Sequence, residues 1–201
     1  MPSRLMHVVV AADIAEALSV RDLGSLLLGA VAPDGSFHKP RSHVKGPRFK
    51  ASGGAPFEVG RFVARHPPSI DQAYLLGYVT HLMADALWAQ VLYFSGVKRD
   101  LLSTPEGYAR LYRDYAVLNH VLGSRHPFAE WRGALAAAPA PPDLPELTAV
   151  EAERARQETL QDMTGEEGAG QTLRVLSLEL VDAYCERAAV AVVDASRGWW
   201  R

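Results

Sequence analysis

Apolar residues recur at every third or fourth position in two segments near the start of the chain, residues 3–18 and 22–31. This spacing lines up apolar side chains along one face of a helix. Ser3 belongs to the residue types that accept hydrogen bonds at a helix N-terminus, so it suits the start of the first segment. The pattern predicts two amphipathic helices, and it puts His7 on the buried side of the first.

The longest apolar stretch runs from residue 73 to residue 92, inside a helix expected from about Ser69 to Phe94. Its length approaches that of a membrane span. However, it contains His81 and Asp85, and an Asp at the centre of a bilayer costs about 2.5–3.5 kcal/mol on insertion scales. We therefore predict the buried central helix of a soluble protein that is not transmembrane.

Prolines, glycines and apolar spacing divide the rest of the chain into further helices. They are expected over residues 57–65, 105–122, 127–137, 146–163 and 171–196, with a Pro/Ala linker at residues 138–145. The packing side of the 105–122 helix is expected to consist of Tyr108, Leu111, Tyr112, Tyr115 and Leu118, and that of the last helix of Leu173, Leu176, Leu180 and Tyr184. No strand pattern is strong enough to compete. We predict a single all-α domain, a multi-helix bundle, over residues 1–201.

Residues 35–57 lack usable periodicity and are expected to form a loop. A loop of this length in a compact domain is usually functional or disordered. It contains no acidic residue and five cations, namely Lys39, Arg41, Lys45, Arg48 and Lys50. Arg41 and Arg48 are candidates for holding a phosphate group, because a guanidinium can bind it in a bidentate manner. The alternative is that these side chains are simply solvated.

Composition narrows the range of functions. The formal net charge of −2 at pH 7 gives no general attraction to nucleic acid, so we expect no stable nucleic-acid partner. A single cysteine, Cys185, excludes an internal disulfide framework and a cysteine-rich zinc site. The first residues lack a signal-peptide pattern, and a cytoplasmic location is expected. Any metal must then be held by histidine and carboxylate side chains.

Five histidine and aspartate residues lie where neither solvent nor packing readily explains them. His81 and Asp85 are four positions apart, so on a helix they lie one turn apart on the same face. His7, Asp34 and His43 precede them on a helix face, in a Pro-Asp-Gly turn and in the cationic loop. These imidazoles and carboxylates form a ligand set suited to zinc or a similar divalent ion. The alternatives are a core histidine, a turn cap, a solvated loop residue and a buried hydrogen-bonded pair.

Four segments resemble a known family: MPSRLMH at the start, LLLGAVAPD at 26–34, SH at 42–43 and GYVTHLMADALW at 77–88. Over about the first 120 residues the chain resembles the bacterial zinc-dependent phospholipase C-like family, which is related to the phospholipase C and P1 nuclease group. The resemblance implies an all-α fold with metals in a cleft. It also implies that one zinc is held by Asp34, His43, His81 and Asp85, and that His7 holds a second zinc shared through Asp85.

The family's further zinc ligands have no clear counterpart in this chain. Near the expected helix, the segment YRDYAVLNH offers only Asp114 and His120, and Asp114 is the candidate for an extra ligand. We therefore expect one or two ions, zinc or another divalent metal, in place of the family's three.

Paired divalent ions suit the hydrolysis of phosphoesters. The leading hypothesis is therefore a phospholipase C-like hydrolase of a phosphate-containing small molecule or a phospholipid, with Asp34 or a metal-bound hydroxide as the base. The alternatives are a non-catalytic helical metal-binding or interaction protein with a structural ion, and a helical bundle without metal. Tyr74, Tyr78 and Trp88 either line a cleft or, as we favour, pack in the core. Formation of a homo-oligomer stays open.

Overall fold

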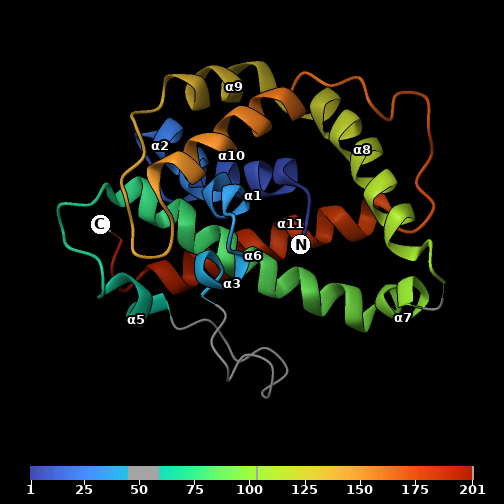
Figure 1. Ribbon diagram of the computed structural model, residues 1–201, viewed down its shortest axis with the longest axis horizontal. Coiled ribbons are helices and arrows are strands. Elements are labelled where there is room, and N and C mark those ends of the chain that lie inside the picture. The colour runs from blue at the N-terminus through green and yellow to red at the C-terminus, as the bar shows by residue number, and fades with distance from the viewer. Residues whose placement is uncertain (45–58, 103, 201) are drawn as a thin grey trace.

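The computed structural model describes residues 1–44, 59–102 and 104–200 and confirms the predicted all-α multi-helix fold (Figure 1). No strand occurs among these residues. The helices are α1 (Arg4–Ala17), α2 (Leu23–Val31), the 3-10 helix η1 (Ala32–Gly35), α3 (Lys39–Ser42), α5 (Val59–Val63), α6 (Gln72–Phe94), α7 (Val97–Leu102), α8 (Gly107–Arg125), α9 (Phe128–Ala137), α10 (Ala149–Asp162) and α11 (Leu178–Ser196).

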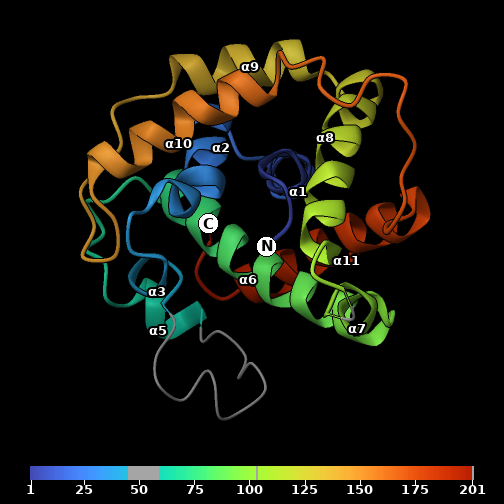
Figure 2. The same cartoon turned by 45° about the vertical axis from the view of Figure 1, so that its right-hand side comes forward.

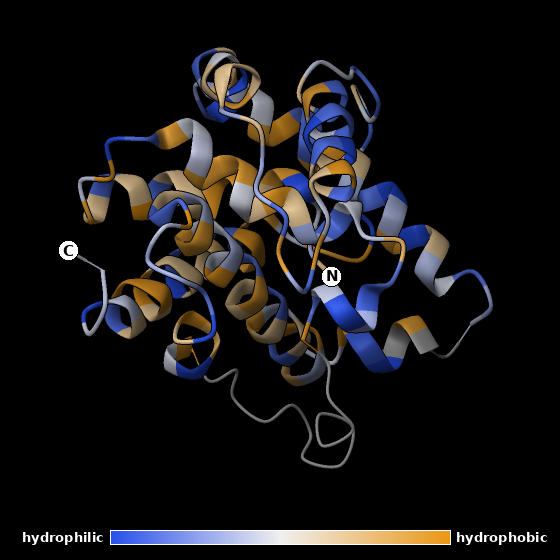
Figure 3. Ribbon diagram, turned by 60° about the vertical axis from the view of Figure 1, so that its left-hand side comes forward, coloured by the Kyte–Doolittle hydropathy of each residue, from blue (hydrophilic) through white to orange (hydrophobic). Residues whose placement is uncertain are grey.

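The first helix lies at the centre of the bundle, in contact with α2, α6, α8, α10 and α11. Figure 2 shows α1 nearly end-on, with α2, α6, α8 and α11 around it. Every residue from Leu5 to Ala11 is buried, so this part of α1 has no solvent-facing side. The apolar residues gather on the inner helices in Figure 3. Ser3 caps α1 as predicted, since its side chain accepts a hydrogen bond from the Met6 amide.

The helices α2 and α6 cross with their backbones in direct contact. A Cβ atom added to Gly29 would lie 2.0 Å from the Tyr74 carbonyl oxygen, and one added to Gly77 would lie 2.1 Å from the Leu26 carbonyl oxygen. Only glycine permits so close an approach at these positions. The crossing brings the last turn of α2 against the middle of α6, where His81 lies.

Some predicted elements differ from the observed ones. The 35–57 loop contains the short helix α3, and residues 45–57 of it lie outside the described part of the chain. The last helix begins at Leu178, seven residues later than predicted, because the Asp114 carboxylate accepts the backbone N–H groups of residues 174–176. Helix α7 was not predicted.

The predicted packing side of α8 is partly wrong. Leu111, Tyr115 and Leu118 are buried, whereas Tyr108 and Tyr112 are 48% and 67% exposed. Tyr112 is displaced by about 100° around the helix from Leu111, so it leaves the buried stripe. Tyr108 lies in the first turn of the helix. Within the described ranges, no helix combines the length and hydropathy needed to span a membrane.

Candidate metal centre

The fold brings together the five histidine and aspartate residues that the sequence singled out. They come from α1 (His7), η1 (Asp34), the residue after α3 (His43) and α6 (His81 and Asp85). They form two groups whose potential ligand atoms lie within 4.8 Å of one another: His7, Asp34 and His81, and His43, His81 and Asp85. His81 belongs to both groups.

Hydrogen bonding fixes the orientation of the His81 ring. Its Nδ1 lies 2.8 Å from the Ala30 carbonyl oxygen, which can only accept a hydrogen bond. The proton is therefore on Nδ1, and Nε2 carries a lone pair in the neutral ring. Metal-binding histidines usually have this arrangement, in which the nitrogen that is not a ligand donates to a carbonyl or carboxylate.

His43 is held in the same way. Its Nδ1 lies 3.1 Å from the Lys39 carbonyl oxygen and 2.8 Å from the Ser42 hydroxyl, which itself lies 3.2 Å from the Pro33 carbonyl oxygen. A proton on Nδ1 satisfies these acceptors and leaves the lone pair on Nε2. The Tyr78 hydroxyl donates to the Ser42 carbonyl at 2.6 Å and fixes the backbone next to the ring.

The lone pairs of His43 and His81 converge. Their Nε2 atoms are 3.3 Å apart, and the Oδ2 of Asp85 lies 3.4 Å from the His43 Nε2. Two neutral acceptor nitrogens repel each other at this distance unless a proton or a cation lies between them. With Zn–N distances of 2.0–2.1 Å, neighbouring ligand atoms of a tetrahedral zinc are about 3.3 Å apart. The observed spacings therefore fit one divalent ion.

His7 is a fully buried imidazole stacked on His81, with ring centroids 4.0 Å apart. Within the described residues neither of its ring nitrogens has a hydrogen-bond partner, although Nε2 lies 3.7 Å from the Oδ1 of Asp85. Burial, and then repulsion from His81, hold the pKa of His7 well below its ordinary value. A neutral buried imidazole without a hydrogen bond is unfavourable unless it binds something.

Asp34 is a buried carboxylate beside a cation. Its Oδ1 accepts a hydrogen bond from the Lys39 ammonium at 3.0 Å, and the same ammonium donates to the Asp34 carbonyl at 2.7 Å. Burial alone would raise the pKa of Asp34, but the attraction of the His81 and His7 rings in their protonated forms, and of Lys39, outweighs it and lowers the pKa below its ordinary value. Asp34 is therefore ionised and suited to bind a cation.

Comparison with known proteins gives no information on the family or the function of this chain. No family model, no curated protein and no solved structure matches this chain. The buried His/Asp groups thus supply the argument for metal binding, and the resemblance of the four sequence segments to the phospholipase C-like family stays an expectation.

Of the other predicted site residues, Arg41 and Asp114 have partners outside the two groups. Arg41 forms an ion pair with Glu151 at 2.5 Å, and Arg48 lies outside the described residues. The Asp114 carboxylate accepts backbone N–H groups from residues 174–176, which gives it a structural partner. Asp114 belongs to no potential ligand group in the described part of the chain.

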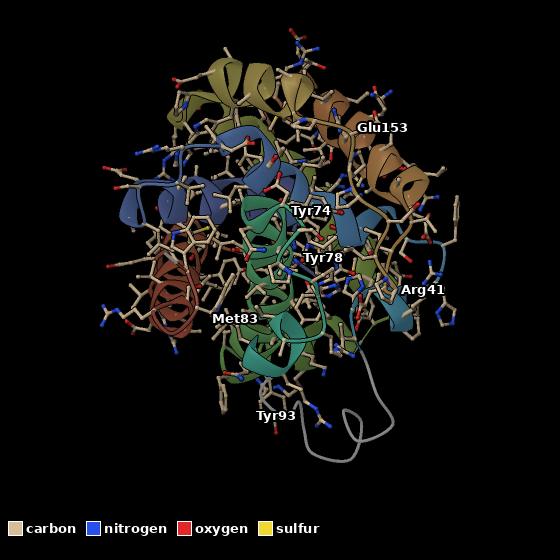
Figure 4. All side chains as sticks on the ribbon, turned by 90° about the vertical axis from the view of Figure 1, so that its left-hand side faces the viewer. Arg41, Tyr74, Tyr78, Met83, Tyr93 and Glu153 are labelled. Carbon is tan, nitrogen blue, oxygen red and sulfur yellow. The ribbon has the colours of Figure 1, made fainter. Side chains whose placement is uncertain are left out.

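The aromatic residues near the site are part of the core, as favoured from the sequence. Tyr74, Tyr78 and Trp88 are at most 1% exposed, and Figure 4 shows Tyr74 and Tyr78 following one another along α6. A pocket of about 500 Å³ lies elsewhere and is lined partly by Asp13, His126 and Trp131. Sequence reasoning missed the roles of Ala30 and Lys39, because a backbone acceptor and a surface-type cation have no local signature.

Proposed function

We propose that this chain is a zinc-dependent hydrolase of phosphoester bonds. The observation that carries the proposal is the convergence of the His43 and His81 Nε2 atoms and the Asp85 carboxylate at the spacing of metal ligands. Imidazole and carboxylate ligands suit zinc, and other divalent ions of similar size fit the same set.

The five residues provide for one or two ions. His43, His81 and Asp85 would hold the first. The second group shares His81 with the first, and the Nε2 of His81 binds a single ion, so a second ion would rely on His7 and Asp34. The Oδ1 of Asp85 lies 3.7 Å from the His7 Nε2 and could move to complete that position. In this arrangement the Asp85 carboxylate would link the two positions, as the family resemblance implies. It differs from the resemblance in placing Asp34 with His7 instead of with His43 and Asp85.

Bound divalent ions lower the pKa of a coordinated water and stabilise negative charge on phosphoryl oxygens. The lowered pKa of Asp34 makes it a weak base, so we assign it to ligand binding instead of proton abstraction. Lys39 balances the Asp34 charge, and its side chain is 38% exposed, which leaves it within reach of solvent and of an anionic substrate. The proposed substrate class is a phosphate-containing small molecule or a phospholipid.

One observation favours a second candidate, a non-catalytic protein with a structural ion. His7 and His81 are fully inaccessible and the His43 side chain is 1% exposed, so a substrate must approach through Asp85, Asp34 and Lys39. Structural zinc sites are closed in this way, whereas catalytic sites keep one position open.

Metal content and turnover separate the two candidates. Protein purified without chelator or a histidine tag should contain about one to two zinc per chain. The chromogenic diester bis(p-nitrophenyl) phosphate should be hydrolysed, with activity lost on dialysis against chelator and restored by zinc. His81→Ala should lose metal and activity, and the control His120→Ala, an exposed histidine of α8, should keep both.

Zinc without turnover of this diester or of phospholipid vesicles would favour the structural ion. Folded wild-type protein that binds no zinc would overturn both candidates.

A further inference from the structure

Glu151 is a buried carboxylate in the first turn of α10 whose two oxygens are both engaged. Its Oε1 accepts hydrogen bonds from the Ser36 hydroxyl at 3.1 Å and the Phe37 amide at 2.9 Å. Its Oε2 accepts from Arg41 at 2.5 Å and from the amide and hydroxyl of Thr148 at 2.9 Å each. A buried carboxylate with this many donors is fixed in place and fixes its donors in turn.

Three of these donors belong to one short segment, residues 34–43. Asp34 stands at its start and His43 at its end, and both are candidate metal ligands. Ser36, Phe37 and Arg41 lie between the two. Glu151 therefore holds the segment at three points between the two ligands that it carries.

Backbone packing reinforces this attachment. A Cβ atom added to Gly35 would lie 1.9 Å from the Glu151 carbonyl oxygen, so η1 rests directly on the first turn of α10. Arg154, one turn further along α10, donates to the Gly35 carbonyl. The Ser36 hydroxyl also accepts from the His38 amide at 3.0 Å and continues the network toward α3.

We infer that Glu151 is a positioning residue for the proposed metal centre, which sets the placement of Asp34 and His43 without binding the ion itself. This inference rests on the proposed function and assigns a role to part of the carboxy-terminal third of the chain. Arg41 then serves as the counter-charge of Glu151. Figure 4 shows Arg41 well separated from Glu153, which lies two positions further along α10.

Glu151→Gln tests this role, with Glu153→Gln as the matched control. Glutamine at the third helical position still supports the cap at Thr148, so the helix start is preserved while the charge and two acceptor positions are lost. Glu153 is on the same helix with its side chain 43% exposed, and among the described residues its partners belong to α10 itself, Gln157 at 2.7 Å and Arg156 at 3.1 Å.

Two measurements distinguish positioning from general stability. Zinc affinity, measured by competition with a chromogenic chelator, should fall about ten-fold in Glu151→Gln and stay unchanged in the control. The visible absorption of the Co²⁺-loaded protein should also weaken, because loss of Asp34 or His43 from the ion changes its coordination geometry. A purely structural role would lower the melting temperature without changing the cobalt spectrum.

Wild-type affinity and an unchanged cobalt spectrum in Glu151→Gln would overturn the inference and leave the proposed centre standing. Absence of zinc binding by wild-type protein would overturn both. If Glu151→Gln does not fold, Ser36→Ala takes its place, since it removes one attachment of the segment and leaves the contacts to Thr148 and Arg41 intact. The same loss of affinity and the same spectral change are expected there, and their absence counts against the inference.

Discussion

Replacing Gly77 by alanine tests whether the crossing of α2 and α6 holds the metal centre together. The new Cβ would lie 2.1 Å from the Leu26 carbonyl oxygen and 2.7 Å from the Ala30 amide nitrogen, whereas ordinary contacts begin at 3.4 Å. Both neighbours are backbone atoms, so neither can rotate away. Helix α2 must retreat by about 1 Å, and the Ala30 carbonyl that accepts from His81 moves with it.

The expected loss of stability follows from three contributions. Overpacking of a tight contact costs about 1–3 kcal/mol, and a backbone clash belongs at the upper end of that range. The weakened bond between His81 and Ala30 adds about 1 kcal/mol. Alanine gains up to about 1 kcal/mol over glycine inside a helix. The net destabilisation is about 3 kcal/mol, which lowers the melting temperature of a domain this size by about 6–12 °C.

Thermal unfolding followed by far-ultraviolet circular dichroism measures this change. Gly133→Ala is the matched control, because Gly133 lies in α9 with nothing within 4 Å of the added Cβ. The control should raise the melting temperature slightly, through helix propensity alone. Zinc affinity should fall in Gly77→Ala and stay constant in Gly133→Ala. If both variants gain stability equally, the close crossing and the reasoning built on it are refuted.

Three further outcomes are expected. Asp85→Asn should lower the zinc content of the purified protein, measured by elemental analysis; wild-type content would count against Asp85 as a ligand. Burial holds the pKa of His7 well below its ordinary value, so the unfolded chain takes up a proton that the folded one does not. The unfolding free energy of the zinc-free protein, from urea titrations, should therefore fall as pH drops through about 6.5, and a flat profile would contradict this. Asp114→Asn should lower the unfolding free energy by about 2–4 kcal/mol in the same assay. The reason is that the charge-assisted hydrogen bonds from the backbone N–H groups of residues 174–176 are lost. The exposed control Asp182→Asn should change little, and equal effects would argue against a structural role for Asp114.

The helices and the candidate ligands could be predicted because their signals are local. An apolar residue at every third or fourth position marks a buried helix face whatever lies against it. His81 and Asp85 stand out for the same reason, since a turn of helix places them together on an otherwise apolar surface.

Long-range partners could not be predicted in this way. The sequence made Arg41 a candidate for binding phosphate, and it gave no sign of the ion pair with Glu151, which lies 110 positions later. Asp114 was a candidate ligand, and it accepts backbone groups about 60 positions later. A guanidinium or a carboxylate has the same sequence signature in either role, because only the packing of distant helices determines what it faces.

The distribution of the candidate ligands over α1, η1, α6 and the residue after α3 has an expected kinetic consequence. In the unfolded chain only His81 and Asp85 are near neighbours, so a metal ion meets a weak two-residue site until the helices have packed. We expect a ligand set completed this late to be largely unformed in the folding transition state. Bound metal would then leave the folding rate almost unchanged and slow unfolding, which lengthens the lifetime of the native state.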